Sequence, residues 1–166
     1  MLKISNAQIP ARIGDFDFNL NEIIVAARAA QQQGAHILVT PELSITGYLP
    51  EDLLLRPAFR AASEHALGRL LEASNEFPDL YLIVGIPTWF MDGIKLRAYN
   101  SAVVIQGGQE LQRIHKQKLP NQAVFDELRY FAVGDAPALT EIQGVKIGVL
   151  ICEDAWHVEP AAHLKK

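Results

Sequence analysis

The sequence predicts an α/β domain in which strands and helices alternate before the chain turns to β-hairpins. Three observations lead to this fold class. The 166 residues are 49% hydrophobic and 20% charged, a composition that can form a packed core in one domain. Short aliphatic runs alternate with helical patterns in the first half of the chain, as in β-α-β units. In the second half, apolar runs flank glycines, which is typical of hairpins.

The N-terminal part predicts a strand, a helix and a second strand. Residues 2–8 and 37–40 are short aliphatic runs. Residues 18–33 carry apolar side chains at helical spacing, with Asp15 or Asp17 as the expected N-cap and Gly34 as the expected C-terminal glycine. A β-α-β unit of this kind has parallel strands.

A second helix and a third strand extend this unit. Apolar spacing predicts the helix over residues 57–77, before Pro78, and a buried strand over residues 81–84 that ends at 85–87. The connection at residues 41–52 is long and rich in proline, glycine and acidic residues. Connections of this length in compact domains are often functional.

Glycines mark two hairpin turns in the second half. The expected strands are residues 97–106 with 110–115, around Gly107 and Gly108, and residues 139–142 with 145–151, around Gly144. The last run predicts a buried strand with Cys152 at its C-terminal end. Residues 116–136 between the hairpins are polar and irregular, and only a short helix is expected around Pro160.

Composition argues against several classes of partner. The net charge of −4 and the lack of a basic cluster argue against a nucleic-acid surface. A single cysteine excludes an internal disulfide and fits a reducing compartment. The start of the chain lacks the features of a signal peptide, and no apolar run has the length of a membrane span. We therefore expect a soluble, cytoplasmic chain that binds neither nucleic acid nor membrane.

Candidate catalytic residues follow three predicted strands. Glu42 comes after residues 37–40, Lys116 after 110–115, and Cys152 after the last strand. Together they could perform acyl transfer. A thiolate is the nucleophile, a carboxylate moves its proton, and an ammonium lowers the thiol pKa and stabilises an oxyanion.

Each candidate also has a simpler interpretation. Glu42 could be a solvated loop acid, Lys116 part of a solvated polar patch over residues 115–118, and Cys152 a small buried apolar residue. Lys118 competes with Lys116 for the role of the lysine, and His157 could form a dyad with Cys152. The histidines are scattered, so the sequence predicts no metal site.

Three segments resemble the signature segments of the nitrilase, or carbon–nitrogen hydrolase, superfamily, in the same order. They are Pro41-Glu42, residues 116–120 (KQKLP) and residues 148–154 (GVLICED). The resemblance implies an α-β-β-α sandwich. It also implies that Glu42 is the general base, that Lys116 is the catalytic lysine and that Cys152 is the nucleophile.

Two further stretches are similar to the glutaminase domains of glutamine-dependent NAD⁺ synthetases. They are residues 48–54 (YLPEDLL) and 124–131 (VFDELRYF). This resemblance implies that Tyr48, Glu127 and Trp156 line the glutamine site. The subgroup usually has a tyrosine where this chain has Gln122, which can hydrogen-bond to substrate but cannot stack on it.

The resemblance also implies a larger protein. We expect residues 1–166 to be an incomplete, N-terminal part of the sandwich, with L-glutamine as substrate and a synthetase domain as partner. No cofactor is expected in this chain, because ATP, Mg²⁺ and deamido-NAD⁺ would serve the synthetase domain. We further expect a homo-oligomer, and weak or no turnover by the isolated 166 residues.

Two other functions remain open from sequence. The chain could belong to another carbon–nitrogen hydrolase, such as an ω-amidase or a carbamoylase, and Gln122 is the feature that favours this alternative. It could also be a catalytically inactive module that associates with another chain through exposed apolar surface.

Overall fold

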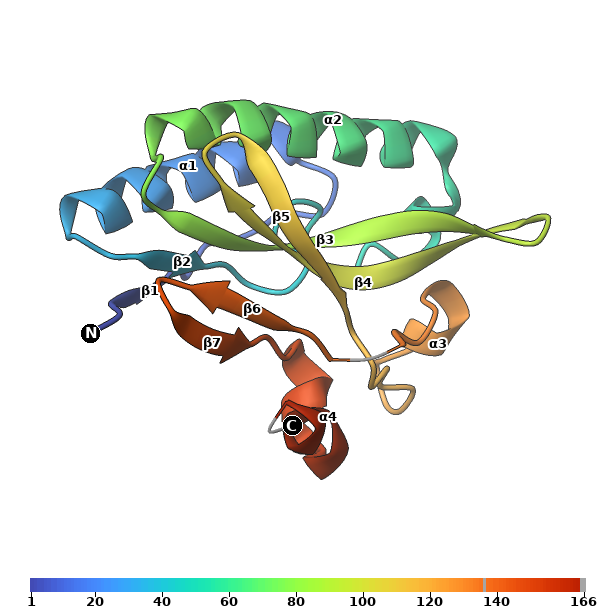
Figure 1. The fold of residues 1–166 in the computed structure, drawn as a ribbon. Helices are drawn as coiled ribbons and strands as arrows, with labels where there is room; N and C mark the ends of the chain where they lie inside the picture. The colour runs from blue at the N-terminus through green and yellow to red at the C-terminus, as the bar shows by residue number, and fades with distance from the viewer. Residues whose placement is uncertain (136, 165–166) are drawn as a thin grey trace.

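The computed structural model describes residues 1–135 and 137–164, which form three layers (Figure 1). Helices α1 (Phe16–Gln32) and α2 (Pro57–Ala73) cover one face of a five-stranded sheet, and a two-stranded sheet lies against the other face. This mixed α/β architecture confirms the fold class that the sequence predicts.

The five-stranded sheet has the order β1-β2-β3-β4-β5. Its strands are β1 (Ile4–Asn6), β2 (Ile37–Val39), β3 (Tyr81–Asp92), β4 (Lys95–Gln106) and β5 (Gln109–His115). The first three run parallel, and β3–β4 and β4–β5 are antiparallel pairs. The predicted β-α-β-α-β order and the hairpin at Gly107 and Gly108 are therefore confirmed.

Helix α1 begins and ends as its sequence predicts. The Phe18 backbone N–H donates to Asp15 Oδ1 at 3.3 Å, which caps the N-terminus. Gly34 adopts a φ of 68°, in the left-handed region, and so closes the C-terminal end. Leu20 and Ile23 of this helix are buried against the sheet, and each contributes roughly 1.5–3 kcal/mol.

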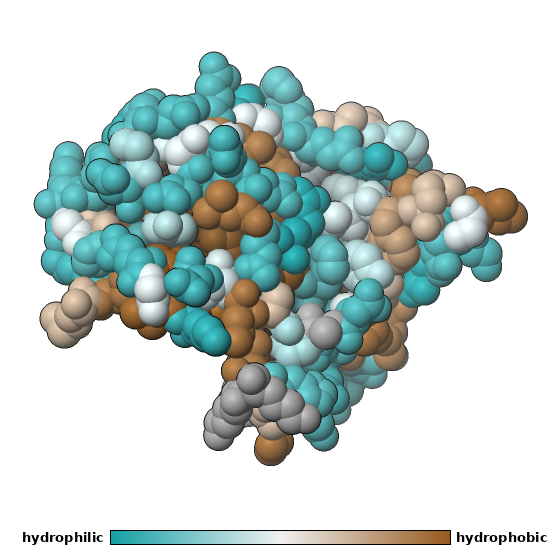
Figure 2. All heavy atoms as spheres, viewed as in Figure 1, coloured by the Kyte–Doolittle hydropathy of each residue, from teal (hydrophilic) through white to brown (hydrophobic). Residues whose placement is uncertain are grey.

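The β3 strand is longer than predicted. It passes through residues 85–87 to Asp92, and Gly93 then turns the chain into β4. Within the described sheet, β2 pairs with β3 only as far as Ile83, so Pro87 lies where one edge of β3 is unpaired. Sheets tolerate proline in such positions. The hairpin projects from the body (Figure 1), and its end carries hydrophobic surface (Figure 2). Met91 and Ile94, on either side of the Gly93 turn, are exposed.

The smaller sheet consists of β6 (Leu139–Ile142) and β7 (Val145–Gly148), which confirms the second hairpin. The prediction of a buried strand over residues 145–151 is wrong. Strand β7 ends at Gly148, and Val145 is 47% exposed. Because β7 pairs only with β6 in the described chain, much of the strand meets water, and burial resumes only at Ile151.

Cys152 therefore does not end a strand. It begins the 3₁₀ helix η3 (Cys152–Trp156), which leads to α4 (Val158–His163). The other short helices are η1 (Glu51–Leu55), η2 (Ser74–Glu76) and α3 (Glu127–Tyr130). Within the described ranges, none of the helices is both long and apolar enough to cross a membrane.

Candidate active site

Glu42, Lys116 and Cys152 come together between the two sheets. Lys116 Nζ lies 2.6 Å from Glu42 Oε1. Glu42 and Cys152 line the same cavity, of about 320 Å³, whose other walls come from β2, β3, β4 and residues 149–151. The three candidates, separate in sequence, thus form one constellation.

The turn that carries Glu42 is fixed to strand β3. The Ile45 backbone N–H donates to the Gly85 carbonyl at 3.2 Å, and Thr40 and Ser44 hydroxyls lie 2.7 Å apart across the base of the turn. A Cβ atom at Gly85 would lie 2.6 Å from the Pro41 carbonyl oxygen. The absence of a side chain at this strand position allows the Glu42 turn to approach the sheet.

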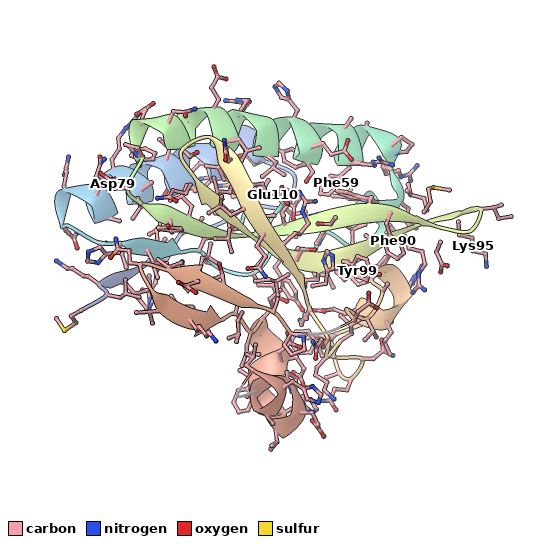
Figure 3. All side chains as sticks on the ribbon, in the orientation of Figure 1. Phe59, Asp79, Phe90, Lys95, Tyr99 and Glu110 are labelled. Atoms are coloured by element: carbon pink, nitrogen blue, oxygen red, sulfur yellow. The ribbon has the colours of Figure 1, made fainter. Side chains whose placement is uncertain are left out.

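The backbone of Lys116 is held by two hydrogen bonds, and its side chain is buried. Its N–H donates to the Asn100 carbonyl at 2.8 Å, and its carbonyl accepts from Gly134 at 2.8 Å. The preceding residue, His115, stacks on Tyr99 with ring centroids 4.2 Å apart, and Tyr99 stacks on Phe90 (labelled in Figure 3). The side chain of Lys116 is fully buried, so its ammonium must be neutralised by the protein.

Two carboxylates neutralise Lys116. Besides Glu42, Glu127 accepts from Nζ with both oxygens at 2.9 Å, and its side chain is also fully buried. Tyr48 donates its hydroxyl to Glu127 Oε1 at 2.8 Å. The sequence resemblance implies that Glu127 lines the glutamine site, and in the structure its carboxylate is buried against the Lys116 ammonium.

This cluster has one cation for two carboxylates, which shapes the pKa values. Burial alone would lower the pKa of Lys116, but Glu42 and then Glu127 outweigh burial and raise it, so the lysine stays protonated. Burial raises the pKa of Glu127, and Lys116 opposes that rise only in part. Burial and the neighbouring Glu127 carboxylate raise the pKa of Tyr48, which keeps its hydroxyl a donor.

Asn100 is a site residue that sequence reasoning missed. Its Nδ2 donates to Glu42 Oε1 at 2.7 Å, and the side-chain oxygen is buried without a hydrogen-bond partner in the described structure. The signal was available, because an asparagine inside an apolar strand is costly unless its amide is used. Asn100 and Lys116 both donate to the same oxygen of Glu42.

Cys152 faces solvent beside the buried cluster. The residue is exposed and has a φ of 46°, a left-handed conformation that is rare for residues with a side chain. Burial of its thiol and then the charge of Glu42 raise the pKa of Cys152, whereas Lys116 lowers it. The thiol is therefore protonated at neutral pH and needs a base to become a nucleophile.

Two sequence alternatives are not supported by the geometry. The Lys118 ammonium is partly exposed and lies 3.5 Å from Glu159, away from the buried cluster that Lys116 forms. His157 Nε2 lies 3.2 Å from Glu153 Oε1, so the imidazole pairs with a surface carboxylate.

The other predicted substrate contacts are dispersed. Tyr48 belongs to the buried cluster through its hydroxyl. Gln122 lines a second hollow, of about 420 Å³, together with Gln117, Lys118 and Glu153. Trp156 is 82% exposed on η3. The structure therefore gathers Glu42, Lys116, Cys152, Tyr48 and Glu127 and leaves Gln122 and Trp156 at the surface.

Comparison with known proteins places these residues in a family context. The model of the carbon-nitrogen hydrolase family matches residues 3–166. A glutamine-dependent NAD(+) synthetase of Thermotoga maritima is 40% identical over 164 residues, which cover 98% of this chain and 27% of that protein. This chain therefore spans only about a quarter of that relative's length.

Solved structures agree with the sequence comparison. The glutamine-dependent NAD+ synthetase from Acinetobacter baumannii, in complex with ADP, has a TM-score of 0.87 at 38% identity, covering 98% of this chain and 30% of that chain. An amidase from Nesterenkonia sp. has a TM-score of 0.76 at 25% identity, covering 90% of this chain and 54% of that chain.

Proposed function

Because this chain belongs to the carbon-nitrogen hydrolase family, we propose that its site hydrolyses the side-chain amide of L-glutamine. The observation that carries the proposal is the placement of Glu42 and Cys152 on one cavity, with Lys116 hydrogen-bonded to Glu42. The synthetase relatives supply the substrate, since their names state dependence on glutamine.

Glu42 acts as the general base through Oε2. Its Oε1 already accepts hydrogen bonds from Lys116 and Asn100, so Oε2 is the oxygen that takes the Cys152 proton. The sulfur then attacks the amide carbon and a tetrahedral intermediate forms, with the positive charge of Lys116 stabilising its oxyanion. Glu42 returns the proton to the nitrogen, the C–N bond breaks, and ammonia leaves a γ-glutamyl thioester on Cys152.

Water completes the cycle. Glu42 removes a proton from a water molecule, which attacks the thioester carbonyl. Collapse of this second intermediate breaks the C–S bond, and the thiol regains its proton while glutamate leaves. Glu127 and Tyr48 do not react in these steps. Glu127 holds Lys116 in place by accepting its hydrogen bonds, and Tyr48 donates to Glu127.

The ammonia is used by a partner activity. In this proposal a synthetase domain uses it, with ATP, Mg²⁺ and deamido-NAD⁺, to make NAD⁺, and residues 1–166 form part of the glutaminase domain. We place the protein in the cytoplasm, because its one cysteine must remain a free thiol. We also propose a homo-oligomer, since exposed Met91 and Ile94 on the projecting hairpin favour association.

A hybrid enzyme tests the proposal. Residues 1–164 of this chain would replace the matching segment of the Thermotoga maritima synthetase, and NAD⁺ synthesis would be measured with glutamine or with ammonia. We expect the hybrid to use both and its Cys152→Ala variant to use ammonia alone. Glutamine-dependent synthesis by Cys152→Ala would refute the role of the thiol, and activity with ammonia verifies that the synthetase part of each protein is folded.

Hydrolysis of other amides is the second candidate function. The similarity to an amidase favours it, and so does Gln122, which departs from the synthetase subgroup. Ammonia release from glutamine and from propionamide by the same protein separates the two. Faster release from propionamide would favour the amidase function.

A further inference from the structure

Asp154, two residues after the nucleophile, has a buried carboxylate, and both of its oxygens accept hydrogen bonds from the backbone. The residue is only 4% exposed. Oδ1 accepts from the backbone N–H groups of Gln117 at 3.0 Å and Lys118 at 2.7 Å. Oδ2 accepts from the backbone N–H of Ile151 at 3.2 Å. One side chain thus binds three backbone donors.

These donors belong to the two segments that carry the catalytic lysine and cysteine. Gln117 and Lys118 directly follow Lys116, and Ile151 directly precedes Cys152. Asp154 therefore connects the chain after β5 to the start of η3 through a side chain that does not line the cavity shared by Glu42 and Cys152. Its hydrogen bonds restrict how far Lys116 and Cys152 can move apart.

A local helix cap would not explain this arrangement. The bond from Ile151 is a cap of η3, because it lies within the same turn. The bonds from Gln117 and Lys118 span 37 and 36 residues and contribute nothing to capping η3. Most of the hydrogen bonding of this carboxylate thus serves the contact between the two segments.

We propose that Asp154 is a positioning residue that fixes the Lys116 ammonium relative to the Cys152 thiol. The inference rests on the proposed function for its catalytic meaning, but the geometry can be tested without turnover. An ionised carboxylate suits this role, since three N–H donors approach its two oxygens. An amide offers one oxygen only, and its NH₂ group would face an N–H donor.

The single cysteine of the chain makes the test specific. Alkylation by iodoacetamide reports on Cys152 alone, and its rate follows the thiolate fraction. The rate would be measured against pH for the wild-type chain, Asp154→Asn, Lys116→Met and the double variant. Asp126→Asn is the matched control, because the Asp126 side chain is 54% exposed and contacts Arg129.

We expect Asp154→Asn to slow alkylation at pH 7.5 by about three- to tenfold, since the thiol loses the nearby ammonium and one pKa unit corresponds to tenfold. The substitution should add no further effect in the Lys116→Met background, because both changes remove the same interaction. Alkylation that is unchanged or faster would overturn the proposal, and so would equal effects of Asp154→Asn in the two backgrounds. Asp126→Asn should match the wild type.

A second measurement avoids the risk that Asp154→Asn fails to fold. In the wild-type chain, amide hydrogen exchange at Gln117, Lys118 and Ile151 should be slow compared with exchange at exposed loop amides. Exchange at loop rates would overturn the proposal. If the wild-type chain shows the expected alkylation and exchange but the hybrid enzyme has no glutamine-dependent activity, the proposed function is contradicted and the positioning role stays supported.

Discussion

Lys116 Nζ lies 2.6 Å from Glu42 Oε1, although 74 residues separate them in the sequence. This contact joins the turn after β2 to the end of β5. Asn100 donates to the same oxygen from β4, so three neighbouring segments of the large sheet determine the position of the carboxylate. The charge balance around this contact gives the following predictions.

Glu42→Gln should separate thiol reactivity from catalysis. Glutamine turnover should fall by at least about 100-fold, because the general base is lost. Alkylation of Cys152 at pH 7 should become faster, since the Glu42 charge raises the pKa of the thiol. Turnover is measured in the hybrid enzyme and alkylation by mass spectrometry.

Glu76→Gln is the control for this substitution, because Glu76 is half exposed and pairs with Arg28 at the surface. It should change neither rate. Slower alkylation in Glu42→Gln, or turnover that persists, would contradict the role given to Glu42.

Lys116→Met should destabilise the fold by about 3–5 kcal/mol at pH 7, because Glu127 and Glu42 lose their cation. This loss of stability should become smaller as the pH falls. The buried Glu127 has a raised pKa, so the folded state binds its proton more tightly than the unfolded state and regains stability below that pKa. Urea unfolding between pH 4 and pH 8 measures both effects.

Lys118→Met provides the matched comparison, since Lys118 forms only a partly exposed pair with Glu159. The substitution should change the free energy of unfolding by no more than about 1 kcal/mol. Equal losses in the two lysine variants would show that Lys116 is not a buried, neutralised cation.

Asn100→Ala should affect catalysis more than stability. The substitution removes a hydrogen bond to a carboxylate, worth about 1.5–3 kcal/mol, and also a buried unpaired oxygen that costs about 1–3 kcal/mol. These two effects on the free energy of unfolding nearly cancel. Turnover, in contrast, should fall roughly 10- to 100-fold, because Glu42 loses its fixed orientation. Urea unfolding and glutamine turnover check the two parts. A large loss of stability with normal turnover would contradict the account.

Gly85→Ala should destabilise the protein by about 1–3 kcal/mol, because the new Cβ would overlap the Pro41 carbonyl and the Leu43 backbone. The displaced turn should also reduce turnover. Gly68→Ala in α2 is the control, and its effect on stability should have the opposite sign. A Cβ there meets nothing within 4 Å, so alanine should stabilise the helix by about 1 kcal/mol. Thermal unfolding of both variants makes the comparison, and a neutral Gly85→Ala would refute the close approach.

The sequence predicted the parts of the fold that follow from local pattern. Helix α1 matches because Asp15 and Gly34 mark its ends and its apolar residues repeat at helical spacing. Strand β3 was predicted too short, because tolerance of Pro87 depends on where β2 stops pairing. Strand β7 was predicted as buried, but the exposure of Val145 depends on which strands flank it. Which strands lie beside one another is decided by tertiary structure and does not follow from a local sequence pattern.

Some residues of the candidate site could likewise be predicted from the sequence, and others needed the structure. Glu42, Lys116 and Cys152 could be found because each interrupts or follows an apolar run and matches a known signature. Asn100 stands out as a polar residue in an apolar run, but the partners of Asn100 and Asp154 could not be predicted, since these contacts depend on side-chain orientation. Glu127 was found by resemblance, but its burial beneath Lys116 became visible only in the structure.

The covalent intermediate is the most direct test of the central claim that Cys152 is the nucleophile of a glutaminase. The hybrid enzyme would be mixed with glutamine, quenched in acid and digested for mass spectrometry. The account predicts one γ-glutamyl group on the peptide that contains Cys152, which hydroxylamine removes and which Cys152→Ala lacks. Glutamine turnover with no such adduct, or with the adduct on another residue, would contradict it.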